Sequence, residues 1–322
     1  MSLSRRQFNI ALGASTLPIA AHASTDFPTK PLRLVVPLTP GSSSDAMCRY
    51  VADKLGQELG KPVVVENRPG GDTVIAVQNV LQAPADGYTM VMASPASMTI
   101  NPLINPKLPY KPSDLRVLMA TLRNHAVIVT APDGKLSTMQ AALAAAKQTP
   151  KAVSLATYSP HYRLSGLRLQ EMAGVKFNEV AYKGAPQMQT DVIGGSVDLG
   201  LFDVGGTLPL IQTGKLKALA VTGKKRHMML PNVPTVIESG VPGYEAAVWI
   251  GFAVPAKTPD AVAKRLVAAL QKVTRTPEFK VFVDKTTFSE ILAYDEAKSN
   301  AMIQSENDTF RKLVKDYNIT LN

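Results

Sequence analysis

Residues 32–45 have the sequence LRLVVPLTPGSSSD, an apolar stretch that runs into a loop of proline, glycine and small hydroxyl residues. The run Leu32–Leu38 is rich in β-branched residues, which favours a buried strand. From Asp45 to Leu59 apolar residues recur at helical spacing, and Gly60 is placed to end that helix. This unit predicts an α/β fold in which the first loop lies at the start of a helix.

The same alternation of strand and helix continues outward from this unit in two series. In the first, strands at Val63–Val65 and Tyr88–Ala93 flank a helix at Val74–Leu81. The second begins near residue 126, and its predicted strands are Ala126–Thr130, Val153–Thr157, Phe177–Tyr182, Val197–Phe202 and Lys217–Thr222. Such an order is typical of mostly parallel sheets flanked by helices.

The chain length fits this division. A length of 322 residues allows about two domains at roughly 150 residues each, and a hydrophobic content of 45% is too high for a disordered protein. We expect one lobe from residues 24–125 plus 235–322 and another from residues 126–234, with a hinge that the chain crosses twice. The single cysteine excludes a disulfide framework. Cys48 shares a helix face with Val51 and Leu55, which favours a buried side chain over a reactive thiol.

Residues 1–23 have the pattern of an export signal. Arg5 and Arg6 precede a short apolar stretch, and Ala21-His22-Ala23 has the small-x-small form of a cleavage site. Ser4–Phe8 resembles a twin-arginine signal, and a Sec signal is the alternative. We therefore predict a periplasmic protein, soluble after cleavage, because no later segment has 18 uninterrupted apolar residues.

The charge does not indicate a nucleic-acid partner. Loss of the signal removes two arginines and leaves 33 basic against 25 acidic residues, a net charge of +8. These residues are dispersed, apart from Lys224-Lys225-Arg226, and there is one tryptophan, so basic stripes and stacking platforms are missing.

Catalytic, metal and cofactor motifs are also missing. His125, His161 and His227 lack metal-ligand spacing and are expected at the surface or the hinge. The loop Gly41–Asp45 has no glycine after its serines, as a nucleophile elbow would need. A hydrolase with His161 as base is therefore the disfavoured alternative, and we predict no catalytic residues, no metal and no cofactor.

Two loops offer anion-binding groups instead. Ser42–Ser44 and Thr157–Pro160 each follow a predicted strand and precede a helix, where backbone N–H groups, hydroxyls and the helix dipole favour a negative charge. Either loop alone is an ordinary helix cap. Facing each other across a cleft, the two would hold a small carboxylate.

A series of motifs then carries a family resemblance. They are PTKPL (28–32), VVENRPG (64–70), DGYT (86–89), YKGA (182–185), GGSVD (194–198), GKLKALAVT (214–222), LPNVPT (230–235) and PGYE (242–245). Over residues 28 to about 260 the chain resembles the Bug-type receptors, the extracytoplasmic solute-binding proteins of tripartite tricarboxylate transporters. The resemblance implies a two-lobed periplasmic-binding fold that closes around a small carboxylate, and membrane permease subunits as partners. A sensor kinase is the alternative partner, and we expect a monomer.

The resemblance also implies a set of ligand-binding residues at the ends of the strands. These are Gly41, Ser42, Ser43, Asp45 and Ser94 in the first lobe, and Ser159, His161, Tyr162, Arg163, Gly184, Ala185 and Asp203 in the second. Asp203 would repel an acid, so we expect its carboxylate to face a hydrogen-bond donor.

Two departures from the family pattern concern the loops. Ser42 stands where the family usually has a second glycine, and Ser159–Arg163 replaces a small glycine-rich loop. Our hypothesis is that Tyr162 or Arg163 helps to set specificity for an aromatic or second carboxyl group. The alternative, that both side chains point to solvent, is equally open.

Overall fold

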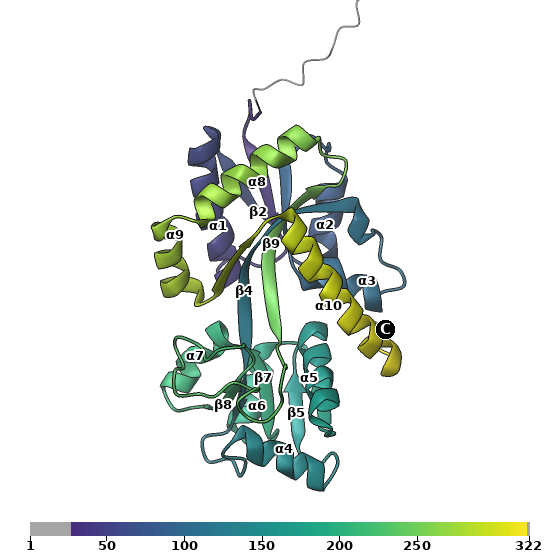
Figure 1. Ribbon diagram of the computed structural model, residues 1–322, viewed down its shortest axis with the longest axis vertical. Coiled ribbons are helices and arrows are strands. Elements are labelled where there is room, and N and C mark those ends of the chain that lie inside the picture. Colours follow the sequence, from purple (N-terminus) through teal and green to yellow (C-terminus); the bar gives the residue numbers. More distant parts are fainter. Residues whose placement is uncertain (1–26, 321–322) are drawn as a thin grey trace, which may run out of the picture.

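The computed structural model describes residues 27–320 and the side chains of all of these except Ser43. The predicted export signal, residues 1–23, lies outside this range. Figure 1 shows two lobes stacked along the long axis and joined by two long strands, β4 (Leu115–Thr130) and β9 (Ala247–Pro255). The predicted α/β class is confirmed.

The first lobe is built on the strand–loop–helix unit that opens the chain. Strand β1 (Leu32–Val36) pairs in parallel with β2 (Val63–Asn67) and β3 (Thr89–Ala93), and β9 pairs antiparallel with β3. The other elements of this lobe are α1 (Ser43–Leu59), η1 (Gly71–Thr73), α2 (Val74–Leu81), η2 (Ala96–Ile100), α3 (Asn101–Ile104), η3 (Pro112–Asp114), α8 (Asp260–Thr274), α9 (Pro277–Phe282), η4 (Val283–Thr287), β10 (Glu290–Tyr294) and α10 (Glu296–Asp316). Helices α1 and α8 pack together over one face of this sheet (Figure 1).

The second lobe repeats the arrangement. Strand β5 (Ser154–Thr157) pairs in parallel with β6 (Asn178–Ala181) and β7 (Leu199–Asp203). Its helices are α4 (Met139–Gln148), α5 (Pro160–Ala173), α6 (Ala185–Ile193) and α7 (Val204–Gln212), and its further strand is β8 (Lys217–Val221). In both lobes the parallel strands end toward the other lobe, so the loops that follow them meet between the lobes (Figure 1).

Strand β4 makes the two sheets continuous. Its first part pairs antiparallel with β9, from Leu115 opposite Pro255 to His125 opposite Ala247. Its last part pairs antiparallel with β7 and β8. Each lobe therefore has parallel strands at its centre and antiparallel strands at the hinge. The sequence alone predicted mostly parallel sheets. The antiparallel pairs arise because β4 and β9 cross between the lobes in opposite directions.

The packing refines the expected division into lobes. Val236, Val241 and Tyr244 are buried in one cluster with Ala126 and Leu155 of the second lobe. We therefore propose that the second lobe continues to residue 246, where β9 begins, instead of ending at residue 234. Cys48 is buried in the first-lobe core, as predicted.

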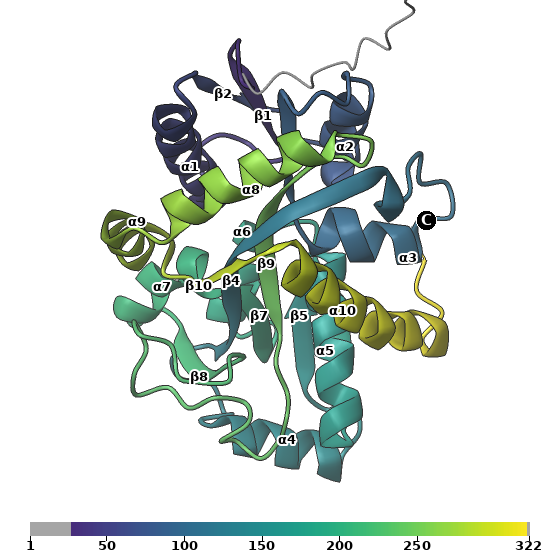
Figure 2. The ribbon, with the colours of Figure 1, turned by 45° about the horizontal axis from the view of Figure 1, so that its top comes forward.

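Helix α10 crosses the hinge on one side. It follows β10 in the first lobe and runs to α5 of the second, as Figure 2 shows. Lys312 of α10 forms an ion pair with Glu171 of α5. This helix therefore contacts both lobes although it belongs in sequence to the first.

The β4–β9 ladder gives a test of the hinge. At Gly251 of β9 a Cβ atom would lie 2.2 Å from the carbonyl oxygen of Met119 in β4. Because the clash is with paired backbone, we expect Gly251→Ala to lower the free energy of unfolding by about 1–3 kcal/mol in urea titrations.

Gly194→Ala is the matched control, since its added Cβ would approach nothing closer than 3.4 Å. If both substitutions lowered the free energy of unfolding equally, the close approach of β4 and β9 at Gly251 would be contradicted.

Candidate ligand-binding site

A cavity of about 670 Å³ lies between the lobes. Loops that follow β1 and β3 line it from the first lobe, and loops that follow β5 and β7 line it from the second. The predicted residues that line it are Gly41, Ser42, Ser94, Ser159, His161, Tyr162 and Asp203. Residues separated by more than 150 positions in the sequence thus meet in one space.

Asp45 holds the first loop in place from beneath. Its carboxylate accepts hydrogen bonds from the Gly41 backbone N–H (3.0 Å), Arg49 Nε (2.9 Å) and Asn67 Nδ2 (2.7 Å). The Ser42 hydroxyl accepts from the Asp45 backbone N–H (3.1 Å) and caps α1. Asp45 itself is 2% exposed and does not line the cavity, so it positions the loop.

These contacts decide the charge of Asp45. Burial raises the pKa of the carboxyl, but the hydrogen bonds from Arg49, Asn67 and Gly41 outweigh it and lower the pKa below its ordinary value. Asp45 is therefore ionised at neutral pH and can hold its three donors.

Two helix starts line the cavity from the second lobe. Ser159 caps α5, and its hydroxyl accepts from the Tyr162 backbone N–H (3.4 Å). Asp203 caps α7: one carboxylate oxygen accepts from the Gly206 N–H (2.6 Å) and the other from the Tyr158 hydroxyl (3.0 Å). Asp203 thus faces hydrogen-bond donors, as predicted.

Aromatic side chains form the wall on this side. The rings of Tyr158 and Tyr162 lie 4.9 Å apart, and that of His161 lies 5.6 Å from Phe310 of α10. Burial raises the pKa of Tyr162 and lowers that of His161 to about 4, so both are neutral at pH 7. We expected His161 at the surface or the hinge, but it is buried because the start of α5 packs beneath α10.

The other predicted residues whose side chains are described lie outside the cavity lining. Arg163 is half-exposed and pairs with Glu179 (3.3 Å) on the outer side of α5. Gly184 and Ala185 start α6 without lining the cavity. Ser43 is the first residue of α1, and its side chain lies outside the described part of the chain. The structure thus separates the two residues of the specificity hypothesis: Tyr162 lines the cavity and Arg163 does not.

Several residues that line the interlobe cavity were not predicted from the sequence. Asp72 and Thr73 line the cavity from η1, and Phe288 lines it from the segment before β10. All three have positive φ angles, of 48°, 82° and 52°. The Gly70-Gly71 pair before Asp72 was a signal for an unusual turn, but nothing in the sequence points to Phe288.

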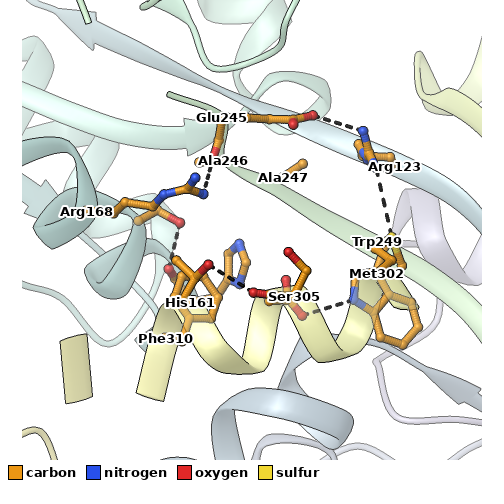
Figure 3. Close-up of a pocket in the computed structure, with 13 residues that line it drawn as sticks. Arg123, His161, Arg168, Glu245, Ala246, Ala247, Trp249, Met302, Ser305 and Phe310 are labelled. Carbon is orange, nitrogen blue, oxygen red and sulfur yellow. Dashed lines mark hydrogen bonds and ion pairs between the residues drawn. The ribbon is translucent and has the colours of Figure 1, made fainter. Parts of the chain in front are cut away.

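A second cavity of about 240 Å³ lies behind His161, between β9, α5 and α10 (Figure 3). Arg123 donates to Glu245 (2.9 Å) at its rim, and Arg168 donates to the Glu245 backbone carbonyl (2.9 Å). Glu306 accepts from Trp249 Nε1 (3.2 Å) and Thr99 Oγ1 (2.9 Å). Burial raises the pKa of Glu306 to about 7, although these donors and the two arginines oppose the rise.

The other two histidines lie at the hinge, as expected. His125 Nε2 lies 3.6 Å from Glu245, and His227 Nε2 lies 2.8 Å from the Phe288 carbonyl oxygen. Within residues 27–320 no group of three or more His, Cys, Asp or Glu side chains is placed to hold a metal ion.

The comparisons agree with this geometry. Residues 47–319 match the model of the tripartite tricarboxylate transporter family receptor. The chain belongs to this receptor family. A relative described as the UPF0065 protein in the tcbD–tcbE intergenic region of Pseudomonas sp. (strain P51) is 31% identical over 97% of this chain and 94% of its own.

Solved structures give the same assignment. The periplasmic binding protein BugD is 28% identical, with a TM-score of 0.74 over 91% of this receptor and 99% of BugD. R. palustris Rpa4515, solved with adipate, is 27% identical, with a TM-score of 0.78 over 91% of this receptor and 99% of its own chain. The predicted periplasmic-binding fold is confirmed, and the protein is a solute-binding receptor and not an enzyme. In the described part of the receptor, no helix is long and apolar enough to span a membrane.

The role of Asp45 can be tested by stability. The Asp45 carboxylate accepts from three N–H groups, whereas the amide of Asp45→Asn has one accepting oxygen and an NH2 group of its own. We therefore expect this substitution to lower the free energy of unfolding by about 1–3 kcal/mol at pH 7. Because the folded-state pKa is lowered below its ordinary value, this difference should vanish as the pH falls through the folded-state pKa. Urea titrations across pH measure both effects.

Asp53→Asn, on the exposed side of α1, is the control. It should lower the free energy of unfolding by less than about 0.5 kcal/mol. A difference between Asp45→Asn and the unmodified receptor that stays constant down to pH 2 would contradict the charged role.

Glu306 gives the opposite pH dependence. Its folded-state pKa is raised, so its contribution to stability is complete below its unfolded pKa and is lost as the pH rises through about 7. Between about pH 5 and pH 8, the free energy of unfolding should fall by about 1–3 kcal/mol more in the unmodified receptor than in the Glu306→Gln variant.

Glu278→Gln, on exposed α9, should keep the profile of the unmodified receptor. Parallel stability curves for Glu306→Gln and the unmodified receptor would show that Glu306 does not titrate in this range.

Proposed function

We propose that this receptor captures a small organic carboxylate between its lobes and delivers it to a tripartite tricarboxylate-type transporter. The observation that carries this proposal is that capped helix starts from both lobes line one cavity, α1 at Ser42 and α5 at Ser159. The binding of adipate by the relative Rpa4515 supports the same ligand class.

The chemistry of the cavity suits a carboxylate. The first N–H groups of a helix have no partner within the helix, and the helix dipole places a partial positive charge at this end. A carboxylate between Ser42 and Ser159 would accept hydrogen bonds from both lobes. Because only the closed arrangement offers both sets of donors, the ligand would stabilise closure by its higher affinity for that state.

The place of action follows from the same family. We place the mature protein in the periplasm on the basis of the signal pattern in residues 1–23 and of periplasmic relatives such as BugD. We propose that it acts there as a monomer. Its partners would be the membrane subunits of the transporter, which receive the ligand when the lobes open.

A thermal-shift screen of the protein without residues 1–23 tests the ligand class. Mono-, di- and tricarboxylates are supplied, and a ligand at 100 times its dissociation constant should add about 2.7 kcal/mol to stability. Stabilisation by one or more organic acids is expected. If no organic acid has an effect, the proposal is wrong, and turnover of an ester would then favour a hydrolase.

Two hydroxyl variants then locate the binding site. Ser42→Ala and Ser159→Ala should each weaken binding of the acid found in the screen about tenfold in calorimetric titrations, since each removes a hydrogen-bond donor to a charged group. Thr138→Ala is the control, because Thr138 caps α4 far from the cavity and its loss should cost only stability, about 1 kcal/mol. Unchanged affinity in both serine variants would contradict this placement.

A further inference from the structure

The charged side chains that line the interlobe cavity are all acidic. In the described residues the lining includes Asp72 and Asp203 and contains no lysine or arginine. His161 is neutral at pH 7 because burial lowers its pKa. A ligand with two carboxylates would therefore find helix N-termini for its charges but no cationic side chain.

The two acids differ in what they contact. Both oxygens of Asp203 are used, by the Gly206 N–H and the Tyr158 hydroxyl. The carboxyl of Asp72, by contrast, forms no hydrogen bond or ion pair with side chains or backbone within residues 27–320. Asp72 is accessible through the cavity, while the protein atoms around it raise its pKa. Its negative charge is thus left without compensation on the first-lobe side.

An unused polar atom lies next to Asp72. Thr73 Oγ1 has no hydrogen-bond partner in the described structure, whereas the ring nitrogens of His161 face the second cavity (Figure 3). Thr73 is 7% exposed and lines the interlobe cavity. Buried polar groups normally have partners, so the Thr73 hydroxyl is a further polar group available to a ligand beside Asp72.

The rest of the wall is apolar or aromatic. Met92, Ile100 and Ile250 line it from the first lobe and the hinge, and Tyr158 and Tyr162 from the second lobe. This surface fits a hydrocarbon or aromatic body between two polar ends.

We propose that the ligand of this receptor is a zwitterion, with a carboxylate at the helix starts of Ser42 and Ser159 and a protonated amine at Asp72. Asp72 is then the residue that sets specificity against dicarboxylates, because a second carboxylate at its side would meet a like charge. This inference rests on the proposed function and narrows its ligand class.

Three acids of one chain length separate the possibilities. Adipate carries two carboxylates, ε-aminocaproate has an ammonium in place of the second carboxylate, and caproate has neither. Calorimetric titrations of the receptor should give ε-aminocaproate an affinity at least about tenfold above that of adipate, with caproate between them or equal to adipate. This comparison needs no variant and holds even if a substitution disturbs folding.

Asp72→Asn tests the residue itself. Asparagine tolerates the left-handed backbone at this position, so the fold should be kept. We expect the preference for ε-aminocaproate over adipate to fall by about tenfold or more, since the ion pair is lost and the repulsion of the dicarboxylate is removed. Asp133→Asn, on an exposed loop, makes the same charge change outside the cavity and should leave the preference unchanged.

The outcomes are distinct. Tighter binding of adipate by the unmodified receptor, no binding of ε-aminocaproate, or an Asp72→Asn variant with an unchanged preference would each overturn this inference while leaving a carboxylate receptor intact. The absence of binding by every acid in the wider screen would instead contradict the proposed function.

Discussion

The antiparallel ladder between β4 and β9 is the constraint on which the structure depends. It carries the chain out of the first lobe and back again, and β4 also pairs with β7 and β8 of the second lobe. Thr222 reinforces its end by accepting from the Ala126 N–H (2.8 Å) and donating to the Ala246 carbonyl (2.5 Å). Because the parallel strands of both lobes end toward this ladder, the loops that follow them lie on either side of one cavity.

Within this frame, buried polar contacts position the loops. Asp45 holds the loop after β1 through three donors, and Asp203 holds the start of α7 through Gly206 and Tyr158. Behind the aromatic wall, Glu306 links α10 to Trp249 of β9 and to Thr99 of η2. The side chains that fix the geometry are thus largely different from those that face the ligand space. Asp72 itself holds none of these contacts, so its replacement by asparagine, which tolerates the left-handed backbone, leaves the positioning of the loops intact.

Local patterns predicted the fold well, because apolar periodicity and helix caps are properties of neighbouring residues. The helix Val74–Leu81 was placed correctly, as was the burial of Cys48. The long first part of β4 and the strands β9 and β10 were missed, since long-range pairing stabilises them more than local propensity. Helix α7 was missed because it contains Gly205, Gly206 and Pro209, which disfavour a helix locally. For the cavity, the position of loops at the ends of predicted strands was enough to select Ser42, Ser159 and Asp203, which line it. The outward direction of Arg163 and the approach of Phe288 depend on tertiary packing, which no local pattern encodes.

A crystal structure of the receptor with an organic acid that stabilises it tests the central claim most directly. We predict electron density for the acid in the interlobe cavity, with a carboxylate within hydrogen-bond distance of the helix starts at Ser42 and Ser159. Density in the cavity between Arg123, Arg168 and Glu306, with the interlobe cavity free of the acid, would contradict it.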